Sequence, residues 1–225
     1  MGTALPLAIP AALLAIERSH GALTSVAVAL SVEAFLMYAL VFVVFYTIVS
    51  TATTRRNEGV LKRLRTGEAA DIQVVTAICA PAFALAVGSF LLTLVLVEVF
   101  GGPHPSFFPL VLAALFGGVT VFAALGFVTS GFTKDAESAQ ITSLPVVLLA
   151  GVGMTNIRGI LPEGPVSDLV AFTPIAVVSD MIHLGWADFS FWETLSRSVK
   201  PVLVVLAWSV ASVIIARRSF RWYVR

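Results

Sequence analysis

The residues of this chain that could do chemistry are few, and they lack the spacings that define common catalytic sites. We interpret the three histidines, His20, His104 and His183, as ordinary residues of loops or interfacial segments, because they stand far apart and form no His-Glu-x-x-His zinc motif. No Gly-x-Ser-x-Gly elbow is present for a serine nucleophile. No lysine follows a glycine, so the phosphate-binding loop of an ATPase is missing as well. We therefore expect no catalytic residue, metal or cofactor in this chain.

Glu33 is the one ionisable residue that lies plainly inside an apolar run. An ionisable group within a membrane span is by default a candidate functional residue. Glu33 could be a proton-coupling or substrate-contacting carboxylate in the outer half of a pathway. Alternatively, it could bond Ser31, Tyr38 or a neighbouring helix. We expect no second buried carboxylate and no intramembrane basic partner, which gives weak support to a stand-alone secondary transporter that uses Glu33.

The segment 54–66 combines basic and apolar residues at helical spacing. A helix here gathers its apolar side chains on one side and directs its basic side chains elsewhere, toward water or an acidic surface. The apolar residues are Val60, Leu61 and Leu64, and the basic residues are Lys62, Arg63 and Arg65. Such a segment could dock a partner protein, or it could simply lie against anionic lipid.

The low content of charged residues indicates which secondary-structure elements position these residues. Of 225 residues, 58% are hydrophobic and 12% are charged, whereas soluble domains have about 25% charged residues. Four runs without any acidic or basic residue are close to or longer than the ~20 residues that span a bilayer as helix: 34–54, 72–97, 99–133 and 138–157. This composition excludes a soluble domain and a nucleic-acid-binding protein. The single cysteine, Cys79, excludes a scaffold of internal disulfides.

The runs are apolar on every face, whereas barrel strands would alternate apolar and polar residues, so we predict helices. The predicted fold is an all-α polytopic membrane protein with six transmembrane helices. The predicted spans are about 3–16, 26–50, 72–99, 107–131, 139–157 and 200–216. A cytoplasmic loop, 51–71, follows the second span. An extracellular cap of short re-entrant or interfacial helices, 158–198, precedes the last span, because its apolar residues are interrupted by proline and glycine.

The distribution of Lys and Arg predicts the orientation. With the carboxyl terminus inside, ten of the fourteen basic residues fall on the cytoplasmic side and four on the outer side. Both termini are therefore expected in the cytoplasm. The first run lacks a basic n-region and a small-residue cleavage site, so we expect a span there and not a secretory signal.

Three groups of residues resemble type-2 ABC transporter permeases of the daunorubicin-resistance and polysaccharide-export kind. The run Glu58-Gly59-Val60-Leu61-Lys62-Arg63-Leu64-Arg65 resembles the segment that follows the second span of that family, beside the ATPase subunit. Leu161-Pro162 followed by Phe172-Thr173-Pro174-Ile175 is similar to the family's outer hairpin. The end, Ala216-Arg217-Arg218-Ser219-Phe220-Arg221-Trp222, resembles its Arg-x-Phe-Arg-Trp finish.

The resemblance implies a single permease domain over 1–225, the membrane subunit of an ATP-driven exporter in the bacterial plasma membrane. It implies a separate ABC ATPase subunit that holds ATP and Mg, and a second permease copy or a homologous partner. The residues expected to contact the ATPase are Glu58, Gly59, Leu61, Lys62, Leu64 and Arg65. The expected cargo is amphipathic or hydrophobic: a drug, a lipid or a glycan.

Overall fold

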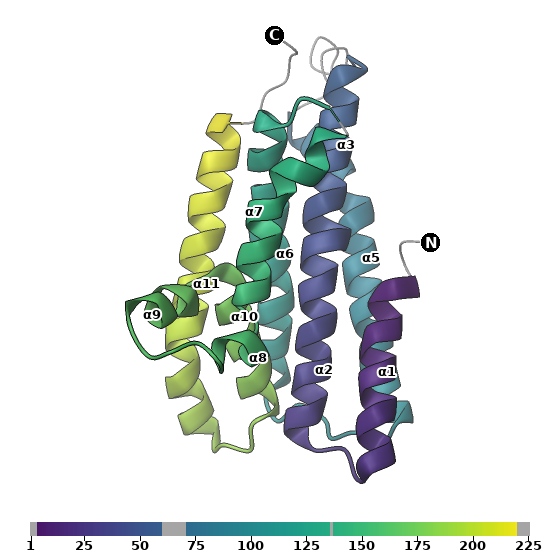
Figure 1. The fold of residues 1–225 in the computed structure, drawn as a ribbon, viewed down its shortest axis with the longest axis vertical. Helices are drawn as coiled ribbons and strands as arrows, with labels where there is room; N and C mark the ends of the chain where they lie inside the picture. The colour runs from purple at the N-terminus through teal and green to yellow at the C-terminus, as the bar shows by residue number, and fades with distance from the viewer. Residues whose placement is uncertain (1–3, 60–70, 136, 220–225) are drawn as a thin grey trace.

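The computed structural model describes residues 4–59, 71–135 and 137–219, and within these ranges the secondary structure is helical, without strands (Figure 1). The elements in chain order are α1 (Ala4–His20), α2 (Ser25–Tyr38), the π-helix η1 (Ala39–Tyr46), α3 (Thr47–Asn57), α5 (Asp71–Val99), α6 (Phe108–Phe132), α7 (Ser138–Val152), α8 (Thr155–Arg158), α9 (Pro165–Ala171), α10 (Pro174–Trp186) and α11 (Phe191–Ser219). We call the end where α3, α6 and α11 finish the upper end, and the end where α2 begins and α10 finishes the lower end, as drawn in Figure 1.

Four helical stretches are long and apolar enough to cross a membrane: Ser25–Asn57, Ile72–Val99, Phe108–Phe132 and Phe191–Ser219. The pair α9 and α10, bent by 72°, could supply a fifth crossing. Among the described residues α7 is apolar but has only 15 residues, and α1 has 17. The predicted helices 72–99 and 107–131 are confirmed to within one residue at each end. The number of six spans stays a prediction.

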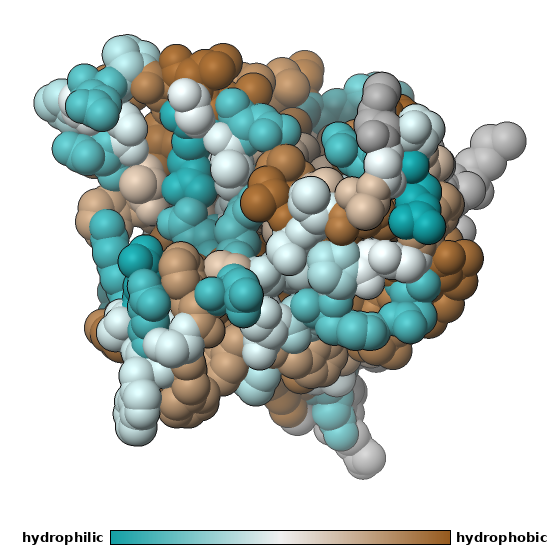
Figure 2. Space-filling view, turned by 90° about the horizontal axis from the view of Figure 1, so that it is seen from below, coloured by the Kyte–Doolittle hydropathy of each residue, from teal (hydrophilic) through white to brown (hydrophobic). Residues whose placement is uncertain are grey.

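The longest stretch, formed by α2, η1 and α3, is also the most enclosed. In its most apolar part 72% of the residues are buried, compared with 28% in α5 and 22% in α11. Its neighbour α6 packs against α3, η1, α10 and α11. Large apolar side chains on α5 and α11 are exposed, as expected for helices that face lipid. Figure 2, which looks onto the lower end, shows hydrophilic residues spread across that end and hydrophobic residues along parts of its margin.

The helix that contains the second predicted span continues past residue 50 to Asn57, and the limits of that span within the membrane stay a prediction. The first seven residues of the predicted loop 51–71 are therefore helical. Hydropathy falls there, but the backbone continues as helix. Arg55 and Arg56 in the last turn suit the negative end of the helix dipole.

The helices observed in the predicted span 139–157 and in the predicted cap 158–198 end and begin at other residues than expected. Helix α7 ends at Val152, and Gly153 packs so closely on α10 that an added Cβ would lie 2.1 Å from the Ile175 Cγ2 atom. Helix α11 begins at Phe191 and not at 200, since the Glu193 carboxylate accepts a hydrogen bond from Arg197 at 2.9 Å and supports its polar first turns. The short helices α8, α9 and α10 therefore occupy a connection from 153 to 190.

Candidate functional site

Glu33 is buried, with 3% of its side chain exposed, and both of its carboxylate oxygens are bonded. The backbone N–H of Thr155 donates to Oε1 at 2.7 Å. The His183 Nε2 atom lies 2.8 Å from Oε2. Glu33 belongs to α2, Thr155 begins α8 and His183 lies on α10, so a single side chain joins three elements that are distant in sequence.

Two further contacts surround this carboxylate. The hydroxyls of Thr155 and Ser179 are 2.7 Å apart. Arg158, at the end of α8, forms an ion pair with Asp180 of α10 at 2.5 Å. We refer to Glu33, Thr155, Ser179 and His183 as the Glu33 cluster. It fixes α8 against α10 and both against α2.

The cluster corrects two expectations. We interpreted His183 as an ordinary loop residue and expected no basic partner for Glu33, but His183 lies in α10 with 25% of its side chain exposed and contacts Glu33. The pairing was hidden because 150 residues separate the two side chains. His104 does lie in a loop, where its Nε2 atom is 3.3 Å from Glu98 Oε2 and its side chain is largely exposed.

The geometry favours a structural role for Glu33. Its acceptor oxygens are occupied by donors of the protein, and a buried polar group is stable when it is bonded in this way. Of the partners that we considered for Glu33, a neighbouring helix is the one observed, through Thr155 and His183. The Ser31 hydroxyl instead donates to the Ala27 carbonyl, and the Tyr38 ring packs on Phe42. Within the described ranges no group of three or more His, Cys, Asp or Glu residues could hold a metal ion.

A second buried charge lies at the upper end, in the last turn of α3. The Arg56 side chain is buried, and its Nη1 atom donates to the Ser130 carbonyl at 2.7 Å. Its Nη2 atom donates to the Thr133 carbonyl. Next to it, the Asn57 Nδ2 atom donates to the Lys134 carbonyl at 2.9 Å. We call Arg56 and Asn57 the Arg56 anchor.

The anchor occupies the carbonyl end of α6. The last carbonyls of a helix have no partner within it and carry the negative end of its dipole, which a guanidinium satisfies well. Sequence reasoning did not single out Arg56 or Asn57 as contacts. The available signal was position, because Arg56 is the second of two arginines that directly follow the uncharged run 34–54.

The predicted partner-contact residues begin immediately after this anchor. Glu58 is exposed and caps α3, with its N–H bonded to the Thr54 carbonyl at 2.9 Å. Gly59 has a φ of +70°, in the left-handed region that glycine adopts at helix ends. Both therefore lie at the upper end. Leu61, Lys62, Leu64 and Arg65 lie outside the described residues.

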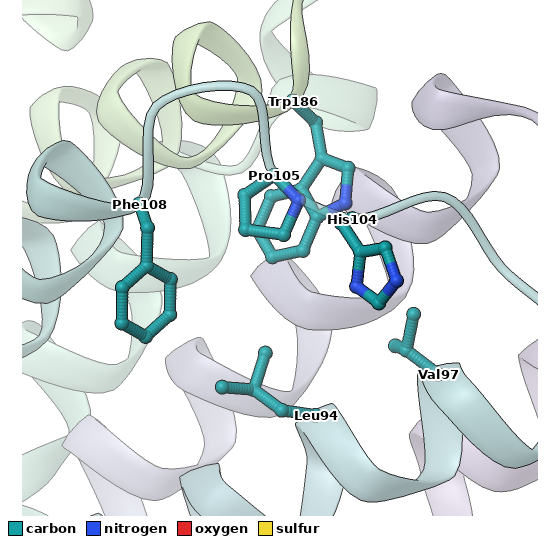
Figure 3. Close-up of a pocket in the computed structure, with 6 residues that line it drawn as sticks. All are labelled: Leu94, Val97, His104, Pro105, Phe108 and Trp186. Carbon is teal, nitrogen blue, oxygen red and sulfur yellow. The ribbon is translucent and has the colours of Figure 1, made fainter.

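Figure 3 shows a small cavity at the lower end, where Leu94 and Val97 of α5 face His104 and Pro105 of the following loop. Trp186 closes one side, and its Nε1 atom donates to the Pro103 carbonyl at 2.9 Å. The volume is about 270 Å³. Ligand pockets commonly measure about 300–1,000 Å³, so this cavity is slightly smaller than a typical ligand pocket.

A helical fold with several helices long and apolar enough to cross a membrane is that of a multi-pass membrane protein. Residues 6–216 match the family model described as ABC-2 family transporter protein. The chain belongs to this family, and it is therefore the membrane permease subunit of an ABC transporter. No curated protein and no solved structure matches the chain. The family implies, in general, an ABC ATPase as partner.

Proposed function

We propose that this chain is the permease of an ATP-driven exporter, working as a pair of identical or homologous copies with ATPase subunits at the upper end. The observation that carries the proposal is the Arg56 anchor, which ties the helix that precedes the predicted docking segment to the end of α6. Family membership supports the transport role. ATP and Mg would bind to the partner ATPase, and no step of bond chemistry belongs to the permease.

The proposed orientation places the upper end in the cytoplasm of a bacterial cell. In the topology predicted from the sequence, ten of the fourteen Lys and Arg residues fall on the cytoplasmic side, and cytoplasmic segments of membrane proteins are enriched in these residues. The basic residues assigned to the outer side are Arg18, Arg158, Arg197 and Lys200. The Glu33 cluster and the short helices then lie toward the outside.

The proposed mechanism is mechanical. Closure of the ATPase pair would displace the segment from Glu58 to Arg65. Because Arg56 and Asn57 bond the carbonyls of the α6 end, that displacement reaches both the α2–α3 stretch and α6. Since α6 packs against α10 and α11, the same displacement would shift the helix bundle between two packed arrangements. We propose an amphipathic or hydrophobic cargo, such as a drug, a lipid or a glycan.

Capture of the partner tests the docking assignment. The probe is an ABC ATPase with a Gly-Lys-Ser/Thr loop from the same organism, purified with the permease from co-expressing cells. We expect Glu58→Lys and Leu64→Asp each to weaken capture about tenfold, which corresponds to about 1.4 kcal/mol of binding free energy. The matched control is Glu98→Lys, the same charge change at an exposed carboxylate of the lower end.

Capture at the level of the unsubstituted chain by both variants would contradict the docking role. Transport in proteoliposomes separates the function from its alternative. Flux that requires ATP supports the exporter, whereas flux driven by a proton gradient without ATP and abolished by Glu33→Gln would support a secondary transporter.

A further inference from the structure

A groove opens between α5, α6 and α11 near the upper end. Its volume is about 580 Å³, more than twice that of the cavity in Figure 3. The lining residues come from the first turns of α5, the second half of α6 and the last turns of α11: Ile72, Val75, Cys79, Thr120, Ala123, Ala124, Phe127, Val213, Ala216 and Arg217. Helix α6 forms the floor, and small residues on it, Ala123 and Ala124, leave the space open.

The interior of the groove suits hydrocarbon. Apart from Arg217, its polar side chains are Cys79 and Thr120, and the Thr120 hydroxyl donates to the Phe116 carbonyl at 2.8 Å within α6. A ligand in the groove would therefore meet mostly methyl, methylene and ring carbons. The groove lies between the two spans whose apolar residues are least buried, α5 and α11, so it faces the lipid side of the bundle.

Among the residues that the structure describes, Arg217 supplies the single charge that lines the groove. It lies in the last turn of α11, where a long basic side chain can reach the membrane interface while its stem stays in hydrocarbon. A guanidinium binds phosphate through two parallel hydrogen bonds. The neighbouring Arg218 has the same charge but does not line the groove.

We propose that the groove binds one acyl chain of an anionic phospholipid, with the lipid phosphate held by Arg217. The apolar walls match the chain, and the cation at the membrane boundary favours a headgroup with net negative charge over one in which a choline cation balances the phosphate. This site goes beyond the proposed function, since it needs neither the ATPase nor the cargo. A zwitterionic lipid without preference and a second copy of this chain are the competing occupants.

Photo-crosslinking of the full chain in nanodiscs tests the proposal. The probes are phosphatidylglycerol and phosphatidylcholine that carry the same diazirine-modified acyl chain, each added at low mole fraction to unmodified phosphatidylcholine. We expect phosphatidylglycerol to label α5 around Cys79 and α6 around Phe127 at least fivefold more than phosphatidylcholine does. Arg217→Gln should remove this preference, whereas the matched control Arg218→Gln should change it less than twofold.

A second variant tests the groove without changing charge. Ala123→Leu fills the floor and should reduce labelling of the groove by both lipids, while labelling of exposed residues such as Leu91 on the lower half of α5 stays the same. Equal labelling by the two lipids, or equal effects of the two arginine variants, would overturn the proposal. Crosslinks between two copies of the chain at the groove would overturn it in favour of a dimer contact. Because no ATPase is present in this experiment, a negative crosslinking result would not count against the proposed exporter function. Likewise, a failure of the ATPase-capture or transport tests would not count against the lipid site.

Discussion

The Glu33 cluster and the Arg56 anchor both hold neighbouring helices together through a buried side chain, but they do so with opposite hydrogen-bonding roles. Each buries a charged side chain of the α2–α3 stretch and uses it to hold a neighbouring element. Glu33 is an acceptor and needs particular donors, the Thr155 N–H and His183, at fixed positions. Arg56 is a donor that bonds carbonyls at a helix end, where several such oxygens lie close together. The Glu33 cluster, which we also call the lower joint, therefore depends on the identity and position of both partners of Glu33. The Arg56 anchor, or upper joint, depends on the shape of one donor, the guanidinium of Arg56.

The largest expected effect comes from removing the acceptor of the lower joint. Glu33→Ala leaves the Thr155 N–H and the imidazole of His183 without their partner, and an unsatisfied buried group costs about 1–3 kcal/mol. Thr155 and His183 are only partly buried, so for the two groups together we expect a loss of about 2–3 kcal/mol in the free energy of unfolding. Thermal unfolding in detergent, followed by the fluorescence of the four tryptophans, measures it.

Glu33→Gln sharpens this prediction, because an amide keeps the volume, an acceptor for Thr155 and a donor for the imidazole. We expect it to retain at least half of the stability that Glu33→Ala loses. Equal losses for the two variants would show that the charge, and not the hydrogen bonds, holds the lower joint.

A smaller effect is expected at the upper joint. Arg56→Ala should cost about 1–2 kcal/mol, because carbonyls at the end of α6 lose two donors, although other polar groups and water lie near a helix end. Arg56→Lys keeps the charge but cannot bridge two carbonyls as a planar fork does. The same unfolding assay should place Arg56→Lys between Ala and the unsubstituted chain. A lysine variant as unstable as the alanine variant would contradict the view that charge at the helix end contributes.

The smallest effect concerns the loop beside the Arg56 anchor. The Asp135 Oδ1 atom accepts hydrogen bonds from the N–H and the hydroxyl of Ser138, both at 2.7 Å, and these bonds hold the pKa of that carboxyl below its ordinary value of 3.8. A lowered carboxyl pKa stabilises the folded chain above pH 3.8, and this contribution is lost as the pH falls through the folded-state pKa. The first turn of α7 should therefore loosen below pH 3.8.

Asp135→Asn isolates this titration. Asparagine caps a helix about as well as aspartate, so stability near neutral pH should hardly change. Its melting temperature should vary less between pH 3 and pH 5 than that of the unsubstituted chain. A pH dependence identical in the two proteins would assign the titration to other carboxylates.

The positions of the long apolar helices could be predicted from the sequence far better than the contacts of the Glu33 cluster and the Arg56 anchor. The spans at 72–99 and 107–131 are close to the observed ones because a long apolar run bounded by charge or by proline leaves little freedom. The start of α11 was missed since its first turns are polar, with Glu193 and Arg197 paired across one turn. Helix α7 ended early because Gly153 meets α10, a contact that appears only after folding.

The pairing of Glu33 with His183 was not predicted for the same reason, because it depends on tertiary contacts. Each residue taken alone is ambiguous, and only the packing of α10 on α2 brings them together. Arg56 is similar, because its acceptors lie 74 and 77 positions further along the chain. The resemblance predicted the family and the permease role, because it rests on local runs of residues that can be recognised without knowledge of the tertiary contacts.

One further consequence follows from η1. A π-helix closes its hydrogen bonds from i to i+5, so its turns are wider than those of an α-helix and shift the angular phase of everything beyond them. Glu33 and Arg56 lie on opposite sides of this segment, about 35 Å apart along the helix axis at 1.5 Å per residue. The stretch from Ser25 to Asn57 is therefore a continuous helix whose helical pitch differs in its middle. A rotation of the helix at the Arg56 anchor could be absorbed within η1, so that rotation and axial displacement need not both reach the Glu33 cluster.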